Sequence, residues 1–246
     1  MYVLKNDALK IYRGKDFVLN DSISIHQPTL DEICDWGEEK YFAFIYNFVA
    51  TPTDKKYQLH QVGIDWNEYT DYELFLSGYK MFSKDMTGLV FGDLDFQAFG
   101  MFKNTENDEL VLYNPELDIS FDRNLYELAA DYLRKSHNIK KNVERAMTET
   151  TKEVLLEEAK EAIESSPNKE YESVLLPLIS TLTNMSGFKY GWRDVWDMKI
   201  NAFMDAATVV PHIKNVDLLL GSGYSGFGID LKKINKKQLN YFSRPD

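Results

Sequence analysis

The sequence predicts a helix-dominated α+β protein, in which a small N-terminal β-meander and a central β-hairpin pack on a bundle of short helices. Apolar residues recur at helical spacing over most of the chain, and only two short regions alternate at the two-residue period of a strand. Two capping-box motifs, beginning at Thr29 and Thr70, mark helix starts. The chain has 246 residues, of which 44% are hydrophobic, so it can form a sizeable core without disulfides or metals.

Residues 9–26 predict the β-meander. Leu9–Tyr12 and Phe17–Leu19 flank a glycine-containing turn, and Ile23 and Ile25 then alternate with polar residues. A proline follows, and it ends the strand region because it cannot donate to a ladder.

The helices of the N-terminal third follow from local signals. The Thr29–Glu32 capping box starts a helix that pauses at Gly37. The next helix, about Glu38–Ala50, is apolar on nearly all faces, so it is either buried or covered by a partner. Residues 51–54 stop that helix and cap a short one, and the Thr70–Glu73 box starts another.

The centre of the chain predicts a β-hairpin. Leu94–Phe99 and Leu110–Tyr113 alternate on either side of a polar turn at residues 104–108. A proline then ends the hairpin, and Asp122 caps a clearly amphipathic helix.

The C-terminal half begins with the longest helical pattern, residues 142–164, whose polar face is rich in glutamate. We interpret that face as solvated, with a docking surface for a basic partner as the alternative. Residues 165–169 are the best candidate for a flexible joint. The chain is therefore expected to be one domain, 1–246, or two lobes, 1–164 and 170–246.

The last predicted helix of substantial length runs over Ile200–Val210 and is halted by Pro211. It follows an aromatic stretch, Gly187–Met198, that holds two of the four tryptophans. Aromatic side chains of this kind serve either a core or an interface. The residues expected to bind a partner are Phe188, Tyr190, Trp192, Trp196, Phe44 and Phe48.

Composition argues against several classes of partner. The formal net charge is −11 and the pI is near 4.9, and such a field repels a phosphate backbone, so we expect no nucleic-acid partner. The lysine-rich segment 232–237 is expected to be a solvated face. No apolar run approaches the ~20 residues that span a bilayer, and no signal peptide is visible at the start, so we expect an intracellular protein without a membrane partner.

No set of residues predicts catalysis. Residues 221–228 contain a literal G-x-G-x-x-G, but a dinucleotide site needs this motif between a strand and a helix, so we expect a flexible loop. Cys34 is the only cysteine, and we expect a small buried thiol rather than a metal ligand. The histidines are scattered without metal-ligand spacing, at positions 26, 60, 137 and 212.

The tight carboxylate pairs near aromatic residues are Asp93 with Asp95 and Asp194 with Asp197. Hydrolases need such pairs at set distances, although Asp194 also suits the first turn of a helix. We therefore expect no catalytic, cofactor-binding or metal-binding residue, and a hydrolase is kept only as the least favoured alternative.

Four stretches carry a resemblance to a family: Ile23–Glu38, Gly92–Phe96, Trp192–Met204 and Ile229–Asn240. They are similar to tail morphogenesis proteins of tailed bacteriophages, among which the nearest named class is the tail assembly chaperone. The resemblance implies a non-enzymatic protein that binds another phage protein, the tape measure protein, in the host cytoplasm. Such chaperones are often shorter than this chain, so a minor structural component of the tail or baseplate, associated with the virion, is the alternative.

Overall fold

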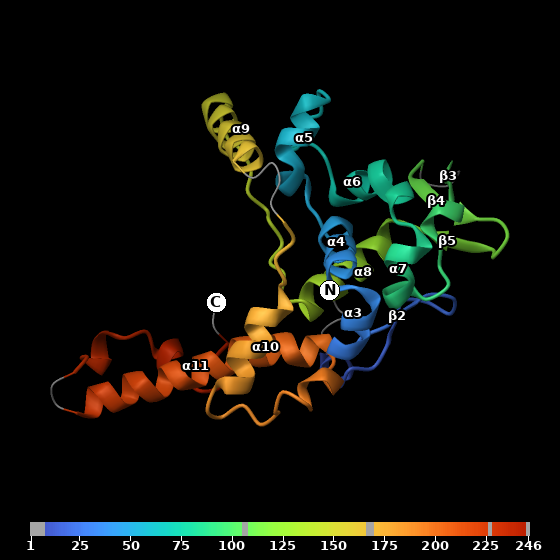
Figure 1. The fold of residues 1–246 in the computed structure, drawn as a ribbon. Helices are drawn as coiled ribbons and strands as arrows, with labels where there is room; N and C mark the ends of the chain where they lie inside the picture. The colour runs from blue at the N-terminus through green and yellow to red at the C-terminus, as the bar shows by residue number, and fades with distance from the viewer. Residues whose placement is uncertain (1–7, 105–107, 166–169, 226–227, 245–246) are drawn as a thin grey trace.

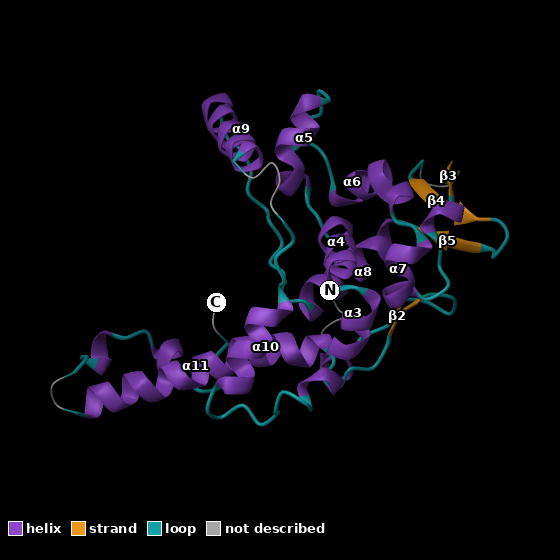
Figure 2. Cartoon of the chain, in the orientation of Figure 1, coloured by secondary structure: helices purple, strands orange, loops and turns teal. Residues whose placement is uncertain are grey.

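The computed structural model describes residues 8–104, 108–165, 170–225 and 228–244. Helices dominate this part of the chain, and its strands form a two-stranded and a three-stranded antiparallel sheet (Figures 1 and 2). The predicted α+β class is therefore confirmed.

The N-terminal region is a helix followed by a hairpin. Helix α2 (Ala8–Tyr12) replaces the first predicted strand, while β1 (Phe17–Val18) pairs with β2 (Ser24–Ile25). Leu9 is 84% exposed and Ile11 is 2% exposed. A strand would place these two residues on one face, whereas a helix places them on nearly opposite faces, so the strand prediction for residues 9–12 was wrong.

Helices α3 (Leu30–Trp36) and α4 (Glu38–Phe48) follow as predicted. Thr29 Oγ1 accepts a hydrogen bond from the Glu32 amide at 3.1 Å, and the Glu32 carboxylate accepts one from the Thr29 amide at 2.6 Å. Gly37 has φ of +105°, which lets the chain turn between the two helices with little strain.

A series of short helices surrounds α4 (Figure 1): η1 (Pro52–Lys55), α5 (Lys56–Gln61), α6 (Asp71–Gly78), η2 (Tyr79–Met81) and α7 (Lys84–Phe91). Both η1 and α6 begin with complete capping boxes, at Thr51 and Thr70. These boxes satisfy backbone amides that the helix itself leaves without partners.

The core is a cluster of aromatic rings around α4. Phe48 is 1% exposed, and its ring centroid lies 5.3 Å from that of Phe75, 5.5 Å from that of Phe91 and 5.6 Å from that of Tyr126. Phe44, 0% exposed, packs edge-on against Phe82 at 5.7 Å. Such pairs add to the free energy of apolar burial, so the apolar α4 is a core helix.

The three-stranded sheet lies beside this cluster. It comprises β3 (Gly100–Lys103), β4 (Leu110–Asn114) and β5 (Ile119–Phe121), in that order. The predicted second strand is confirmed, but the first lies later than expected, because residues 96–98 form the 3-10 helix η3 (Phe96–Ala98). Helix α8 (Arg123–Ser136) follows, and the Asp122 carboxylate caps it by accepting from the Leu125 amide at 2.9 Å, as predicted.

Helix α9 (Glu149–Glu164) begins later than the predicted start at residue 142. The preceding residues are held by side chains from the α5 region: Thr53 Oγ1 donates to the Glu144 carbonyl at 3.0 Å, and the Asn67 side chain donates to the Ala146 carbonyl at 2.9 Å. These bonds compete with a helix for the same carbonyls. Most of the predicted joint, residues 166–169, lies outside the described residues, and the two-lobe division stays a prediction.

The C-terminal part comprises α10 (Leu175–Asn184), η4 (Val195–Asp197), α11 (Ile200–Tyr224), η5 (Leu231–Lys233) and η6 (Lys236–Leu239). Helix α11 does not stop at Pro211, which lies inside it, so that predicted end was wrong. Ile179, Leu182 and Phe203 belong to the same buried cluster as α4. The residues after 228 run back along the distal half of α11 (Figure 1).

Candidate functional site

Residues 185–199, here called the aromatic loop, connect α10 to α11 and are fixed at their C-terminal end. The Leu30 amide donates to the Met198 carbonyl at 3.1 Å, and the Ile200 amide donates to the Pro28 carbonyl at 2.9 Å. Val195 is 0% exposed. The loop is therefore anchored to the N-terminus of α3 by backbone hydrogen bonds and by one fully buried side chain.

The predicted aromatic residues of this loop differ in exposure. Trp192 is 66% exposed and Tyr190 is 48% exposed, whereas Phe188 and Trp196 are half-buried against the core. The Arg193 guanidinium lies 5.2 Å from the Trp192 ring centroid, close enough for a cation–π contact. The loop thus presents an aromatic surface that rests on a buried base.

The prediction that Phe44 and Phe48 bind a partner was wrong. Both side chains are enclosed in the aromatic core of the folded chain and cannot contact another protein. Their apolar surroundings on α4 are explained by burial alone.

Helix α9 forms a second uncovered surface. None of its residues is buried, and it packs beside α5 and apart from the aromatic core (Figure 1). Lys152 joins the two regions, because its ammonium bonds to the Asp65 carboxylate at 2.5 Å. This hydrogen bond lowers the pKa of Asp65.

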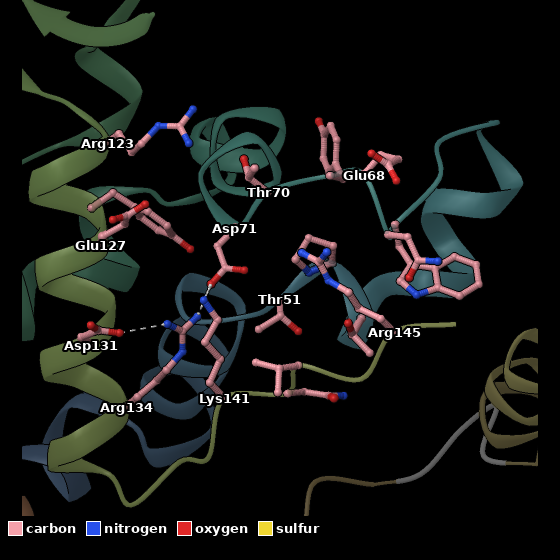
Figure 3. Close-up of a pocket in the computed structure, with 18 residues that line it drawn as sticks. Thr51, Glu68, Thr70, Asp71, Arg123, Glu127, Asp131, Arg134, Lys141 and Arg145 are labelled. Atoms are coloured by element: carbon pink, nitrogen blue, oxygen red, sulfur yellow. Dashed lines mark hydrogen bonds and ion pairs between the residues drawn. The ribbon is translucent and has the colours of Figure 1, made fainter. Parts of the chain in front are cut away.

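A polar pocket of about 510 Å³ lies between α6, α8 and the segment that precedes α9 (Figure 3). At its centre, Asp71 Oδ2 lies 3.0 Å from Arg134 Nη2 and 2.7 Å from Lys141 Nζ. Arg134 also donates to the Val49 carbonyl at 2.6 Å, and its side chain is only 7% exposed. Arg145 points into the pocket from the opposite side (Figure 3).

The charges that line this pocket balance. Four basic and four acidic side chains face it: Arg123, Arg134, Lys141, Arg145, Glu68, Asp71, Glu127 and Asp131. Because the most enclosed of them are already paired, the pocket has no surplus charge for an ionic ligand. The ion pairs of the pocket instead join α6, α8 and the segment that precedes α9, because a buried ion pair holds its partners in place.

Sequence reasoning missed this ion-pair cluster, although one signal was present. Arg134 follows Tyr126 and Ala130 at four-residue spacing, so it occupies the buried stripe of α8. A charged residue in an apolar stripe predicts a buried partner. The partner, Asp71, is distant in sequence and carries no comparable signal.

The carboxylate pairs have separate local contacts. Asp93 is exposed and bonds to Lys84 at 2.7 Å, and this contact lowers the pKa of Asp93. Asp95 caps η3 by accepting from the Gln97 amide at 3.0 Å. Asp194 and Asp197 are exposed on either side of Val195. In the described part of the chain, no group of three or more histidine, cysteine, aspartate or glutamate side chains is placed to hold a metal ion.

The glycine-rich motif is not the loop that we expected. Gly221 and Gly223 lie in the last turn of α11, and residues 226 and 227 lie outside the described residues. A Cβ atom at Gly223 would lie 2.3 Å from Leu231 Cγ. The glycine therefore allows the returning tail to pack closely on α11.

Two further predictions concern titratable residues. Cys34 is exposed rather than buried, because it faces outward from α3.

His137 is buried, and its ring lies 2.6 Å from the Tyr41 hydroxyl and 2.8 Å from the Leu133 carbonyl. Burial lowers the pKa of His137 to about 4, so this histidine is a neutral core residue.

Comparison with protein-family models, curated proteins and solved structures gives no match. Among the described helices, none combines the length and the hydropathy that crossing a membrane requires.

Proposed function

We propose that the chain is a non-enzymatic bacteriophage tail morphogenesis protein that binds another phage protein through the aromatic loop. The resemblance of its sequence to that class supports the biological setting, with the tape measure protein as client in the host cytoplasm. The observation that carries the binding proposal is the exposure of Trp192 and Tyr190 on an anchored loop. Tryptophan, tyrosine and arginine are enriched among the residues that dominate binding energy.

The anchoring of the loop favours binding. A contact surface that is ordered before association loses less conformational entropy on binding than a free segment does. Val195 and the half-buried Trp196 hold the base of the loop, so its exposed rings are displayed by a fixed backbone. Arg193 beside Trp192 adds a cation of the type found in such surfaces.

The test is an affinity pull-down from infected cells, with the client identified by mass spectrometry. The double variant Tyr190→Ala/Trp192→Ala removes the exposed rings. A matched control, Tyr12→Ala/Leu176→Ala, removes two side chains that are 53% and 65% exposed at other sites. We expect the loop variant to weaken binding by on the order of 2 kcal/mol, roughly thirtyfold, and the control to bind normally.

Mass spectrometry of purified particles separates the two roles within tail morphogenesis. A chaperone is absent from virions and captures the tape measure protein, whereas a minor structural component is present in virions at a fixed copy number. Equal recovery of the client with the loop variant and with the control would exclude the aromatic loop as the binding surface.

A further inference from the structure

The side of α9 that faces away from α5 is an unpartnered helix face. At 100° per residue, Val154 and five glutamates lie on this side. Val154 is 52% exposed. We call this surface the α9 face: Val154, Glu153, Glu157, Glu158, Glu161 and Glu164.

The α9 face has an uncompensated negative charge. The helix carries six glutamates and two lysines, a net charge of −4, and no basic residue in its last turn. The C-terminal end of a helix dipole is also negative. Among the described residues, Lys160 lies 3.7 Å from Glu157, and Glu153, Glu161 and Glu164 have no basic partner. A cationic partner would therefore relieve repulsion within the helix.

The residues that return along α11 form a surface of opposite character. Lys232, Lys233 and Lys236 are exposed around the turns η5 and η6. They are accompanied by the exposed apolar residues Tyr224 (80%), Ile229 (44%) and Phe242 (95%). We call these six residues the tail patch. The tail patch combines positive charge with exposed apolar side chains, which together are typical of a surface that binds another protein.

The negative charge of the α9 face determines which protein surface can bind it. The tail patch of the same chain cannot reach it, because α9 lies at the upper left of Figure 1 and the tail lies along the distal half of α11 below. A second α9 would bring two faces of the same sign together. A tail patch from another copy brings the opposite sign. We propose that copies of this chain associate head to tail, with the α9 face of one copy against the tail patch of the next.

This contact joins two different surfaces, so it does not close into a two-fold dimer. Repetition of one heterologous contact gives a ring if the rotation closes and an open filament if it does not. The net charge of −11 opposes association at long range. At physiological ionic strength the Debye length is about 8 Å. The long-range repulsion between two whole molecules is therefore screened more strongly than the attraction between opposite charges that lie directly against each other in the contact.

The test is sedimentation velocity of the purified full chain over a wide range of concentrations, with charge-reversal variants. The tail variant is Lys232→Glu/Lys233→Glu/Lys236→Glu. The α9 variant is Glu153→Lys/Glu161→Lys/Glu164→Lys. A control, Lys15→Glu/Lys135→Glu/Lys140→Glu, makes the same change in net charge as the tail variant at other exposed positions. Far-UV circular dichroism confirms that each variant is folded.

We expect the wild type and the control to form concentration-dependent oligomers. Each reversed variant alone should associate at least roughly tenfold more weakly, because its two surfaces now carry the same sign. An equimolar mixture of the two reversed variants should assemble again, because every α9 face then meets a tail of opposite charge. A monomeric wild type, or a mixture that remains dissociated, would overturn the proposal. Neither result bears on the aromatic loop, because the contact includes none of its residues.

Discussion

The buried imidazole of His137 makes the stability of the fold depend on pH in a defined way. Burial lowers the pKa of His137 from 6.5 to about 4, and burial also raises the pKa of Tyr41 well above its usual range. The neutral ring therefore carries its proton on Nδ1, which donates to the Leu133 carbonyl, while Nε2 accepts from the Tyr41 hydroxyl.

The sign of the effect follows from the lowered pKa. Between pH 6.5 and 4, the unfolded chain binds a proton at His137 that the folded chain does not bind, so acid favours unfolding. The stability is fully present above pH 6.5 and is lost as the pH falls toward 4. One pKa unit corresponds to roughly 1.4 kcal/mol. The lowering of the His137 pKa from 6.5 to about 4 therefore corresponds to a loss of about 3 kcal/mol in the free energy of unfolding at low pH.

The perturbation that isolates this effect is the double variant Tyr41→Phe/His137→Leu. It removes both partners of the hydrogen bond, which avoids leaving a buried hydroxyl unsatisfied. Tyr41→Phe alone keeps the histidine and serves as the control. The measurement is urea unfolding, followed by far-UV circular dichroism at several pH values between 7.5 and 4.5, which is roughly the window of the shift.

We expect the free energy of unfolding of the wild type to fall more steeply with acid than that of the double variant. The difference between them should change by about 2–3 kcal/mol across the window, because carboxylate effects are common to both proteins. The Tyr41→Phe control should follow the wild type. Parallel curves for the wild type and the double variant would refute the assignment of His137 as a neutral buried residue.

Three further predictions concern single side chains. Thr29→Ala removes the cap of α3 and should lower the free energy of unfolding by about 1 kcal/mol in urea titrations, and a loss near zero would mean that the cap is dispensable. Asp71→Asn removes the closer of the two carboxylates that the buried Arg134 contacts, leaving only Asp131 at 3.4 Å, and should destabilise by about 3 kcal/mol. Asp93→Asn, on an exposed pair, is the control and should leave the thermal midpoint unchanged. The exposed Cys34 thiol should react with a thiol reagent in the native protein as fast as in urea, and protection in the native state would contradict its placement.

The parts of the fold that the sequence predicted depend on local chemistry. The Thr29 and Thr70 boxes and the Asp122 cap act over three residues, so the sequence alone specifies them. Pro211 misled the prediction because a missing amide removes only one hydrogen bond. The helix continues beyond it, with Val216 fully buried and the returning tail packed along it.

The candidate site was predictable in part. The pattern of the aromatic loop identified Trp192, but no local signal separates an exposed ring from a core ring. Phe44 and Phe48 satisfied the same criterion and are buried because rings from α6, α7 and α8 pack against α4. The Asp71–Arg134 pair joins residues 63 positions apart, and contacts of that range are decided by tertiary packing.

The tryptophans give the molecule separate optical reporters. None belongs to the phenylalanine-rich cluster around Phe48: Trp66 packs under Lys152 near α9, Trp192 and Trp196 lie in the aromatic loop, and Trp36 stacks with Lys40. Tryptophan emission therefore reports on the aromatic loop, on α3 and on the region beside α9, while ellipticity follows the helical framework. A spectral change that precedes the loss of ellipticity would signal detachment of the loop or of α9 from an otherwise intact interior.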